Sequence, residues 1–181
     1  MTTQELLFVQ MFPEEEKKWQ ELISIIREKF AKLKLPAVAD KELDRALAPG
    51  MPYTGAKGYV EPEGYFYVEA GDRGNCTLIF KTQSKEEAEE LLMKKLAHDV
   101  SYRCIVAEMK ETELKYREDW KYDAKFDYRK YWFEMALYIL KGNVSESRFR
   151  TEIAEYEALM NHWFEQPFWK YDTGKMEFVS I

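Results

Sequence analysis

The sequence contains few of the residues on which metal proteins and many enzymes depend. It has two histidines, His98 and His162, and two cysteines, Cys76 and Cys104, in 181 residues. Neither histidine has a cysteine or histidine partner at the spacing of a zinc site, and the cysteines do not form a CxxC pair. We therefore expect no metal, no other cofactor and no disulfide framework.

Catalytic motifs are also missing. The sequence has no Walker loop, GxGxxG, GxSxG or HExxH motif, which leaves phosphate cradles, dinucleotide folds, nucleophile elbows and zincins without support. The nearest polar constellation is Asp127 with Arg129, where Asp127 favours a helix start and Arg129 is better explained as a bridge to a neighbouring element. We expect no catalytic residues, and the chain is not predicted to be an enzyme.

Long hydrophobic runs are absent as well. No apolar segment approaches the roughly 20 residues that cross a bilayer, and the first residues carry no basic leader, so we expect a cytoplasmic protein that does not bind membranes. The net charge is −6, and residues 61–123 hold five of the six excess charges, with 15 acidic against 10 basic side chains. This acidity argues against direct nucleic-acid binding and would suit a basic protein partner, although simple solubility explains it equally well.

What the sequence does contain is an α+β pattern, expected to form a single domain over residues 1–181. Apolar residues from Trp19 to Leu33 recur at helical spacing behind Pro13 and three glutamates, which predicts an N-terminal amphipathic helix. A connector completes residues 1–56, with a candidate short helix at 41–47 followed by a loop rich in glycine and proline.

A three-stranded antiparallel meander is predicted next. Its strands are expected at 58–60, 65–69 and 76–81, with turns at 61–64 and 71–75. The alternation predicts one buried face, made by Phe66, Val68, Cys76, Leu78 and Phe80. Tyr65, Tyr67 and Glu69 are expected on the opposite face.

About three packed helices should follow the meander. Ser84 and Glu87 form a capping box before the first, Gly142 ends the second, and Ser145 caps the third, whose stripe is predicted to bury Trp163. The tail, 169–181, ends in MEFVSI, a candidate for an added edge strand.

Residues 57–168 contain several short motifs, YVE at 59–61, GYFYV at 64–68, RG at 73–74, FDYRK at 126–130 and WFEQPF at 163–168. In order and spacing these motifs resemble one family of bacterial immunity proteins, immunity protein 63. Gln166 stands where the family usually has histidine before Pro167, and Lys130 where a second arginine is common.

The resemblance implies a protein that binds a cognate domain of a polymorphic toxin and blocks it by occlusion, without catalysis. Basic nucleases are one class of such toxins. We place the partner-binding surface, from charge and position, on the acidic edge of the hairpin and the following helix, at Glu61, Glu63, Asp72, Glu86, Glu87 and Glu90.

Two alternatives stay open. The chain could be a small enzyme or small-molecule-binding protein with a pocket between sheet and helices, lined by Tyr65, Tyr67 and Trp132. It could also be a constitutive subunit of a larger assembly, which a wide exposed apolar patch would indicate.

Overall fold

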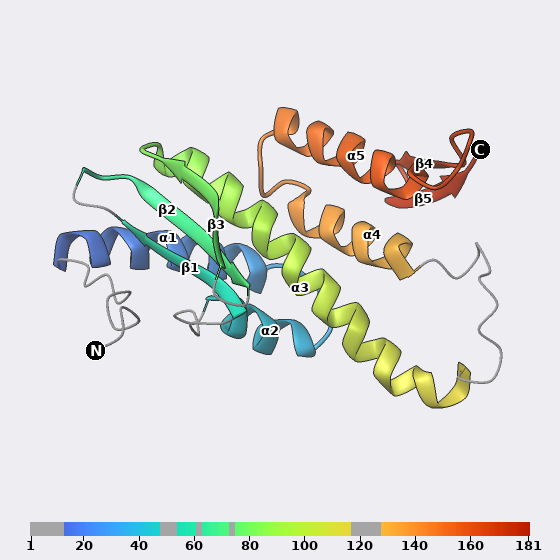
Figure 1. Cartoon of the computed structure of the whole chain (residues 1–181), viewed down its shortest axis with the longest axis horizontal. Coiled ribbons are helices and arrows are strands. Elements are labelled where there is room, and N and C mark those ends of the chain that lie inside the picture. Colours follow the sequence, from blue (N-terminus) through green and yellow to red (C-terminus); the bar gives the residue numbers. More distant parts are fainter. Residues whose placement is uncertain (1–12, 48–53, 61–62, 73–74, 117–127) are drawn as a thin grey trace. The chain divides into compact units, whose positions relative to one another are not determined.

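The structure is a computed structural model that describes residues 13–47, 54–60, 63–72, 75–116 and 128–181. Figure 1 shows its elements along the chain. In sequence order they are α1 (Pro13–Ala31), α2 (Val38–Leu47), β1 (Thr54–Val60), β2 (Phe66–Asp72), β3 (Asn75–Thr82), α3 (Lys85–Tyr116), α4 (Tyr128–Leu140), α5 (Glu146–Asn161), β4 (Trp169–Asp172) and β5 (Glu177–Ser180). The predicted α+β class is confirmed.

The chain divides into two compact units. We call residues 1–32 and 45–92 the sheet unit, and residues 33–44 and 93–181 the helical unit. The sheet unit contains α1, the strands β1 to β3 and the start of α3. The helical unit contains the rest of α3, α4, α5 and the β4–β5 hairpin. The short helix indicated at 41–47 is present as α2, which begins three residues earlier, whereas the β4–β5 hairpin was not predicted as a unit.

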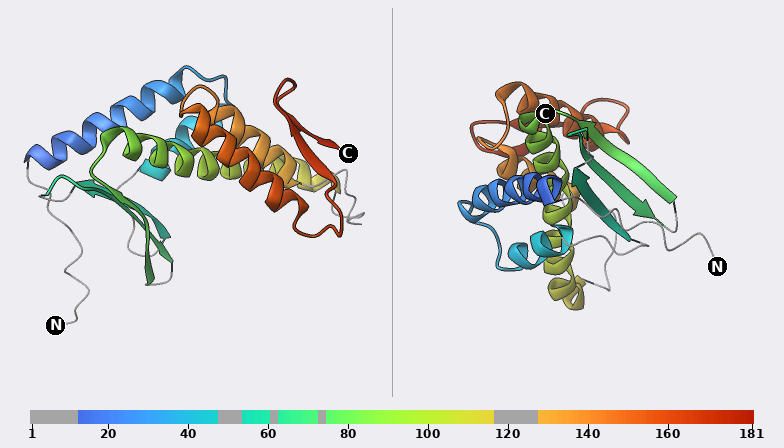
Figure 2. Two further views of the ribbon diagram at one scale, coloured as in Figure 1. Left: turned by 90° about the horizontal axis from the view of Figure 1, so that it is seen from above. Right: turned by 90° about the vertical axis from the view of Figure 1, so that its left-hand side faces the viewer.

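In the sheet unit, α1 supplies an apolar stripe to one face of the sheet. Leu22, Ile26 and Phe30 are buried on α1, and the helix packs against β1. The strand order is β1-β2-β3 with both pairs antiparallel, and Figure 2 shows these strands beside α1. Phe66 and Val68 of β2 fill the covered face, as the alternation predicted.

The burial predicted for Leu78 is wrong, and a β-bulge explains why. Val68 pairs with Phe80, but the next residue of β2, Glu69, pairs with Leu78, so Ile79 is the extra residue of β3. Residues opposite each other in a sheet share a face, and Glu69 lies on the face opposite to that of Val68. Leu78 is therefore turned outwards and is 51% exposed, and Ile79 is 39% exposed.

The expected helix signals at the start of α3 are present. The Ser84 hydroxyl accepts a hydrogen bond from the Glu87 amide at 3.1 Å, as an N-cap does. The Glu87 carboxylate instead accepts from the Thr82 hydroxyl, which ties the helix start to the end of β3. α3 then continues without a break through Asp99 and extends to Tyr116.

In the helical unit, α4 and α5 form the antiparallel pair expected from their short connection. Gly142 adopts a φ of 74° after α4, and the Ser145 hydroxyl accepts from the Arg148 amide at the start of α5. Phe149, Tyr156 and Met160 are buried as predicted, whereas Trp163 is 74% exposed. α5 ends at Asn161, so Trp163 lies beyond the helical stripe that predicted its burial.

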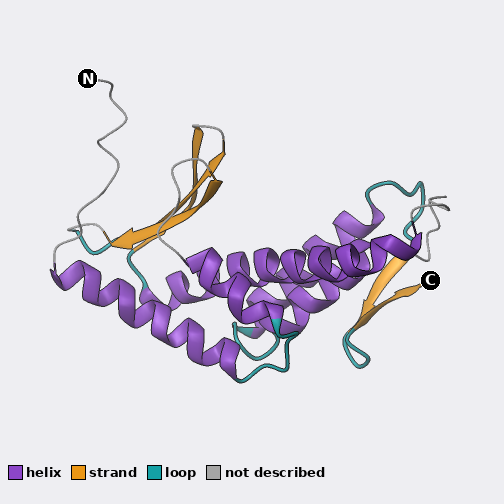
Figure 3. Cartoon of the chain, turned by 90° about the horizontal axis from the view of Figure 1, so that it is seen from below, coloured by secondary structure: helices purple, strands orange, loops and turns teal. Residues whose placement is uncertain are grey.

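The tail does not add a strand to the three-stranded sheet. β4 and β5 pair with each other as a separate two-stranded sheet, seen in Figure 3 as a second group of orange strands. β4 packs on α5 and β5 on α4. Asn161 bonds both Phe168 and Trp169, and Glu157 accepts from the Tyr171 amide at 2.8 Å. These side chains of α5 occupy the outer edge of β4.

No helix in the described ranges combines the length and apolar character that crossing a bilayer requires.

Candidate functional site

Three of the six predicted partner-binding residues lie at one end of the sheet unit. Glu63 is exposed in the turn before β2, and its carbonyl accepts from the Gln83 side chain at 3.3 Å. Gln83 directly precedes the cap of α3, whose first turn exposes Glu86 and Glu87. Hydrogen bonding to its own backbone amide and to the Ser84 hydroxyl lowers the pKa of Glu86, which keeps this carboxylate ionised.

The positions of the other three predicted residues say less about a partner-binding surface. Glu90 is half-buried on α3 and takes part in an interaction. Asp72 is the last residue of β2, opposite Thr54 of β1 and Asn75 of β3. Glu61 lies outside the described residues.

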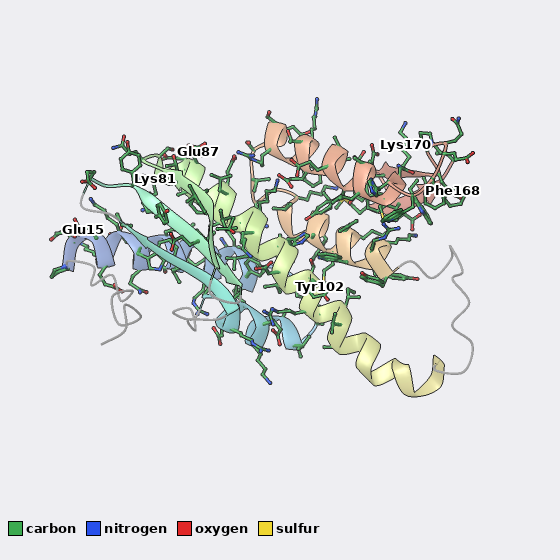
Figure 4. The ribbon with its side chains drawn as sticks, in the orientation of Figure 1. Glu15, Lys81, Glu87, Tyr102, Phe168 and Lys170 are labelled. Atoms are coloured by element: carbon green, nitrogen blue, oxygen red, sulfur yellow. The ribbon has the colours of Figure 1, made fainter. Side chains whose placement is uncertain are left out.

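Next to this acidic end, the outer face of the sheet carries aromatic and apolar side chains. The Lys81 ammonium lies 4.5 Å from the ring centre of Tyr65 and 5.7 Å from that of Tyr67. Figure 4 shows Lys81 near Glu87, in agreement with the bond between Thr82 and Glu87. We call the set formed by Tyr65, Tyr67, Leu78, Ile79 and Lys81 the outer sheet face. Cation–π contacts hold the two rings in place, and the two aliphatic residues stay exposed.

The helical unit has a different polar centre, which we call the α3–α5 seam and define as Lys94, His98, Glu152, Glu155 and Tyr156. Glu152 is only 1% exposed, and Lys94 Nζ lies 2.9 Å from its Oε1 and 2.8 Å from Glu155 Oε2. The contact with Glu152 has the distance of an ion pair without the alignment of a hydrogen bond. Within the described residues, Glu152 Oε2 has no hydrogen-bond donor.

Burial and the contacts between Lys94 and the carboxylates act in opposite directions on the ionisation of this seam. It raises the pKa of Glu152, although Lys94 acts in the opposite direction. For Lys94, burial favours the neutral amine, but its contacts with the carboxylates of Glu152 and Glu155 together outweigh burial and raise the pKa. A single lysine therefore serves two carboxylates, one of them almost wholly removed from water.

His98 lies in an aromatic layer of the same unit. Its Nδ1 is 3.2 Å from the Tyr156 hydroxyl, and its ring centre is 4.4 Å from that of Trp132. The Trp132 indole N–H donates to the His98 carbonyl at 2.9 Å. Burial lowers the pKa of His98 and keeps the imidazole neutral, so that Nδ1 can accept a hydrogen bond from the Tyr156 hydroxyl.

The residues that we considered for a small-molecule pocket fall in different units. Tyr65 and Tyr67 belong to the sheet unit, where they flank Lys81, and Trp132 belongs to the helical unit, where it contacts His98. In the ranges that the structure describes, no group of three His, Cys, Asp or Glu side chains could hold a metal ion.

Sequence reasoning missed the exposure of Leu78 and the burial of Glu152, and only Glu152 had a local signal. Strict alternation places Leu78 on the face of Phe80, and the bulge at Ile79 reverses this. Glu152 lies three residues after Phe149 and four before Tyr156, so it belongs to the buried stripe of α5.

Comparison with protein-family models, with curated proteins and with solved structures finds no match to this chain.

Proposed function

We propose that the chain is an inhibitor of another protein, of the immunity type that its motifs resemble, and that it neutralises a cognate toxin domain in the cytoplasm by occupying it. In this proposal the chain performs no catalysis. Its support comes from the outer sheet face and from the acidic turn and helix start that adjoin it. A basic nuclease domain is the partner class that the acidity favours.

The observation that carries this proposal is the exposure of Leu78. A leucine 51% exposed on an edge strand, beside an isoleucine 39% exposed, is apolar surface that a partner could cover. Tyr65 and Tyr67 lie on the same outer face, and rigid aromatic side chains are common anchors of protein interfaces. The bulge in β3 disturbs the backbone edge, so side-chain docking is favoured over addition of a strand.

The acidic residues have a different part in the proposal. Glu63 and Glu86 are exposed to solvent, where a single ion pair contributes little to affinity but accelerates the encounter with a basic partner. Leu78 and Ile79 would supply the affinity, because covering apolar surface is worth roughly 25 cal/mol per Å².

A matched pair of substitutions tests the proposal. Leu78 is 51% exposed in the sheet unit, and Leu159 is 49% exposed in the helical unit, so Leu78→Asp and Leu159→Asp introduce the same charge at equal exposure. The partner to test is the C-terminal domain of the protein encoded by the adjacent gene, produced with and without this chain. We expect Leu78→Asp to weaken binding and protection of cells at least about tenfold.

Leu159→Asp should behave like the unmodified chain. Equal losses in the two variants would remove the outer sheet face from the proposal. Full protection by both variants would have the same consequence. A neighbouring domain that neither harms cells nor binds the chain would contradict the immunity function itself.

A second candidate function is a small enzyme or ligand-binding protein, and the α3–α5 seam is the observation that favours it. Burial raises the pKa of Glu152, and a neutral histidine hydrogen-bonded to Tyr156 lies in the same seam. Groups with shifted pKa values often act as acids and bases. Turnover of a small compound by the purified chain, abolished by Glu152→Gln with the fold intact, would establish this function in place of the first.

A further inference from the structure

The turn between β4 and β5 fixes a methionine in an unusual backbone conformation. Met176 has a φ of 60°, in the left-handed region that residues with a Cβ rarely adopt. Its amide donates to the Asp172 carbonyl at 2.7 Å. The Asp172 carboxylate also accepts from the amides of Gly174 and Lys175, at 2.9 and 3.0 Å. The turn is therefore closed by several hydrogen bonds, and the Met176 side chain starts from a defined position.

Two strong donors approach the sulfur of this side chain. Lys141 Nζ lies 3.0 Å from Met176 Sδ, and the Tyr171 hydroxyl lies 3.5 Å from it. Burial, with the nearby charge of Glu134, raises the pKa of Tyr171, so the phenol keeps its proton and can donate. A thioether is a weak acceptor, so its hydrogen bonds with the ammonium group and the phenol are weak.

We propose that Met176 is a site of reversible oxidation, and that Lys141 and Tyr171 hold the sulfoxide that forms. With hydrogen peroxide as the oxidant, a sulfur lone pair bonds to one peroxide oxygen and the O–O bond breaks. The other oxygen leaves as water after a proton transfer, so the thioether is oxidised and the peroxide reduced. The sulfoxide oxygen is a strong acceptor to which both donors can bond. Methionine sulfoxide reductases, as a class, would restore the thioether.

The partial exposure of Met176 distinguishes it from the buried methionines of the same unit. Met93 and Met160 are completely buried, so that a sulfoxide there would place a polar oxygen in the core and destabilise it. Met176 is half-buried at the surface, so an oxidant can reach it, and its product meets two donors. Oxidation at this position should therefore strengthen the attachment of the β4–β5 hairpin.

Graded treatment of the purified full chain with hydrogen peroxide tests the proposal. Peptide mass spectrometry measures the sulfoxide at each of the eight methionines, and thermal unfolding is followed on the same samples. Met176 should oxidise before Met93 and Met160. Subtracting the change seen in Met176→Leu isolates the effect of this residue, which we expect to be a rise of about 2–4 °C in the unfolding midpoint.

The variant Lys141→Ala shows whether the donors are responsible, and it needs no substitution of the methionine. It should remove more than half of the rise on oxidation. Three results would overturn the proposal: a fall in the midpoint specific to Met176, an undiminished rise in Lys141→Ala, or oxidation of Met176 only after that of Met93 and Met160. None of these measurements depends on the proposed inhibitor function.

Discussion

The two units of this chain both expose apolar side chains, but they differ in how deeply they bury a charged group. The sheet unit leaves Leu78 and Ile79 exposed and has an ion pair between Lys85 and Glu21 in solvent. The helical unit removes Glu152 from water and pairs it with Lys94. A buried charge commits a region to one packed arrangement, whereas exposed apolar groups leave a surface to be covered. In the proposed function, the exposed residues of the sheet unit contact the partner, and the buried pair of the helical unit stabilises the fold.

The two sheets differ in the same sense. The outer edges of the β4–β5 hairpin are occupied by side chains of the helices, with Asn161 and Glu157 on β4 and Glu134 on β5, where Glu134 accepts from the Phe178 amide at 2.6 Å. In the sheet unit, β3 is an edge strand that carries a bulge and two exposed aliphatic residues. The outer edges of the small sheet are covered by its own chain, whereas the larger sheet exposes Leu78 and Ile79 beside the bulge of its edge strand.

The largest stability effect is expected from Asn161→Ala. Asn161 accepts from the amides of Phe168 and Trp169 and donates to the carbonyls of Trp169 and Glu157, all at 2.8 Å. Its removal should cost about 3 kcal/mol of unfolding free energy, measured by denaturant titration, because several partly buried backbone groups lose their partner.

Hydrogen exchange should speed up at the amides of Phe168 and Trp169 in the same variant. Asn143→Ala is the control, since the Asn143 side chain donates to the Ile139 carbonyl at 2.8 Å outside the hairpin, and it should cost about 1 kcal/mol. Equal costs for the two variants would show that the hairpin is not held through its edges.

Replacing one lysine in each unit should lower the unfolding free energy by different amounts. Lys94→Met leaves the buried Glu152 without its cation and should cost about 2 kcal/mol. Lys85→Met removes the partner of Glu21 from a pair whose side chains are 39% and 50% exposed, and should cost about 0.5 kcal/mol or less. Chemical denaturation of both variants measures the difference, and similar costs would contradict the distinction between the units.

The stability of the helical unit should depend on His98 as the pH falls. Burial lowers the pKa of His98 below its ordinary value of 6.5, so the unfolded chain binds the proton more readily than the folded one. The contribution of His98 is therefore complete above pH 6.5 and is lost as the pH falls from there through the folded pKa. Thermal unfolding between pH 7.5 and 6 should show the decline.

The variant His98→Asn offers an oxygen to the Tyr156 hydroxyl without a titrating ring, and should flatten this dependence. His162→Asn, at an exposed position after α5, should leave the dependence intact. The titrations of Glu152 and Glu134 have the opposite sign, because burial raises both pKa values and acid then favours the folded state. If His98→Asn leaves the dependence of the unfolding midpoint on pH unchanged, the imidazole of His98 does not cause that dependence.

The smallest effect on partner binding is expected from the acidic end of the sheet unit. Replacing Glu63 and Glu86 together by lysine should slow association with the partner domain severalfold at low salt and hardly change dissociation. The difference should fade at physiological ionic strength, because the Debye length is then about 8 Å. Glu165→Lys, an exposed change in the helical unit, is the control. Association rates that do not respond to the double change would remove these residues from the interface.

Local rules predicted much of this fold, because a few adjacent residues determine each helix cap and turn. Ser84, Ser145 and Gly142 ended or began helices where their chemistry indicated. The exposure of Leu78 could not be predicted in the same way, because it depends on the register between two strands. The exposure of Trp163 was missed for a related reason, since a helical stripe predicts burial only while the helix continues.

The candidate site was predictable only in part. Glu63 and Glu86 were proposed from charge and position, and the structure places both at one end of the sheet unit. The α3–α5 seam requires knowing which helices meet, because Lys94 and Glu152 are 58 positions apart in the sequence. Pairing across such a separation is a property of the packing, and no local pattern encodes it.

Hydroxyl-radical footprinting of the chain with and without its partner domain tests the central claim most directly, because it reports side-chain exposure at each residue. The account predicts strong protection of Tyr67, Leu78 and Ile79 on mixing, with Tyr131 and Trp163 of the helical unit labelled as before. Protection confined to Tyr131 and Trp163, with Leu78 unchanged, would contradict it.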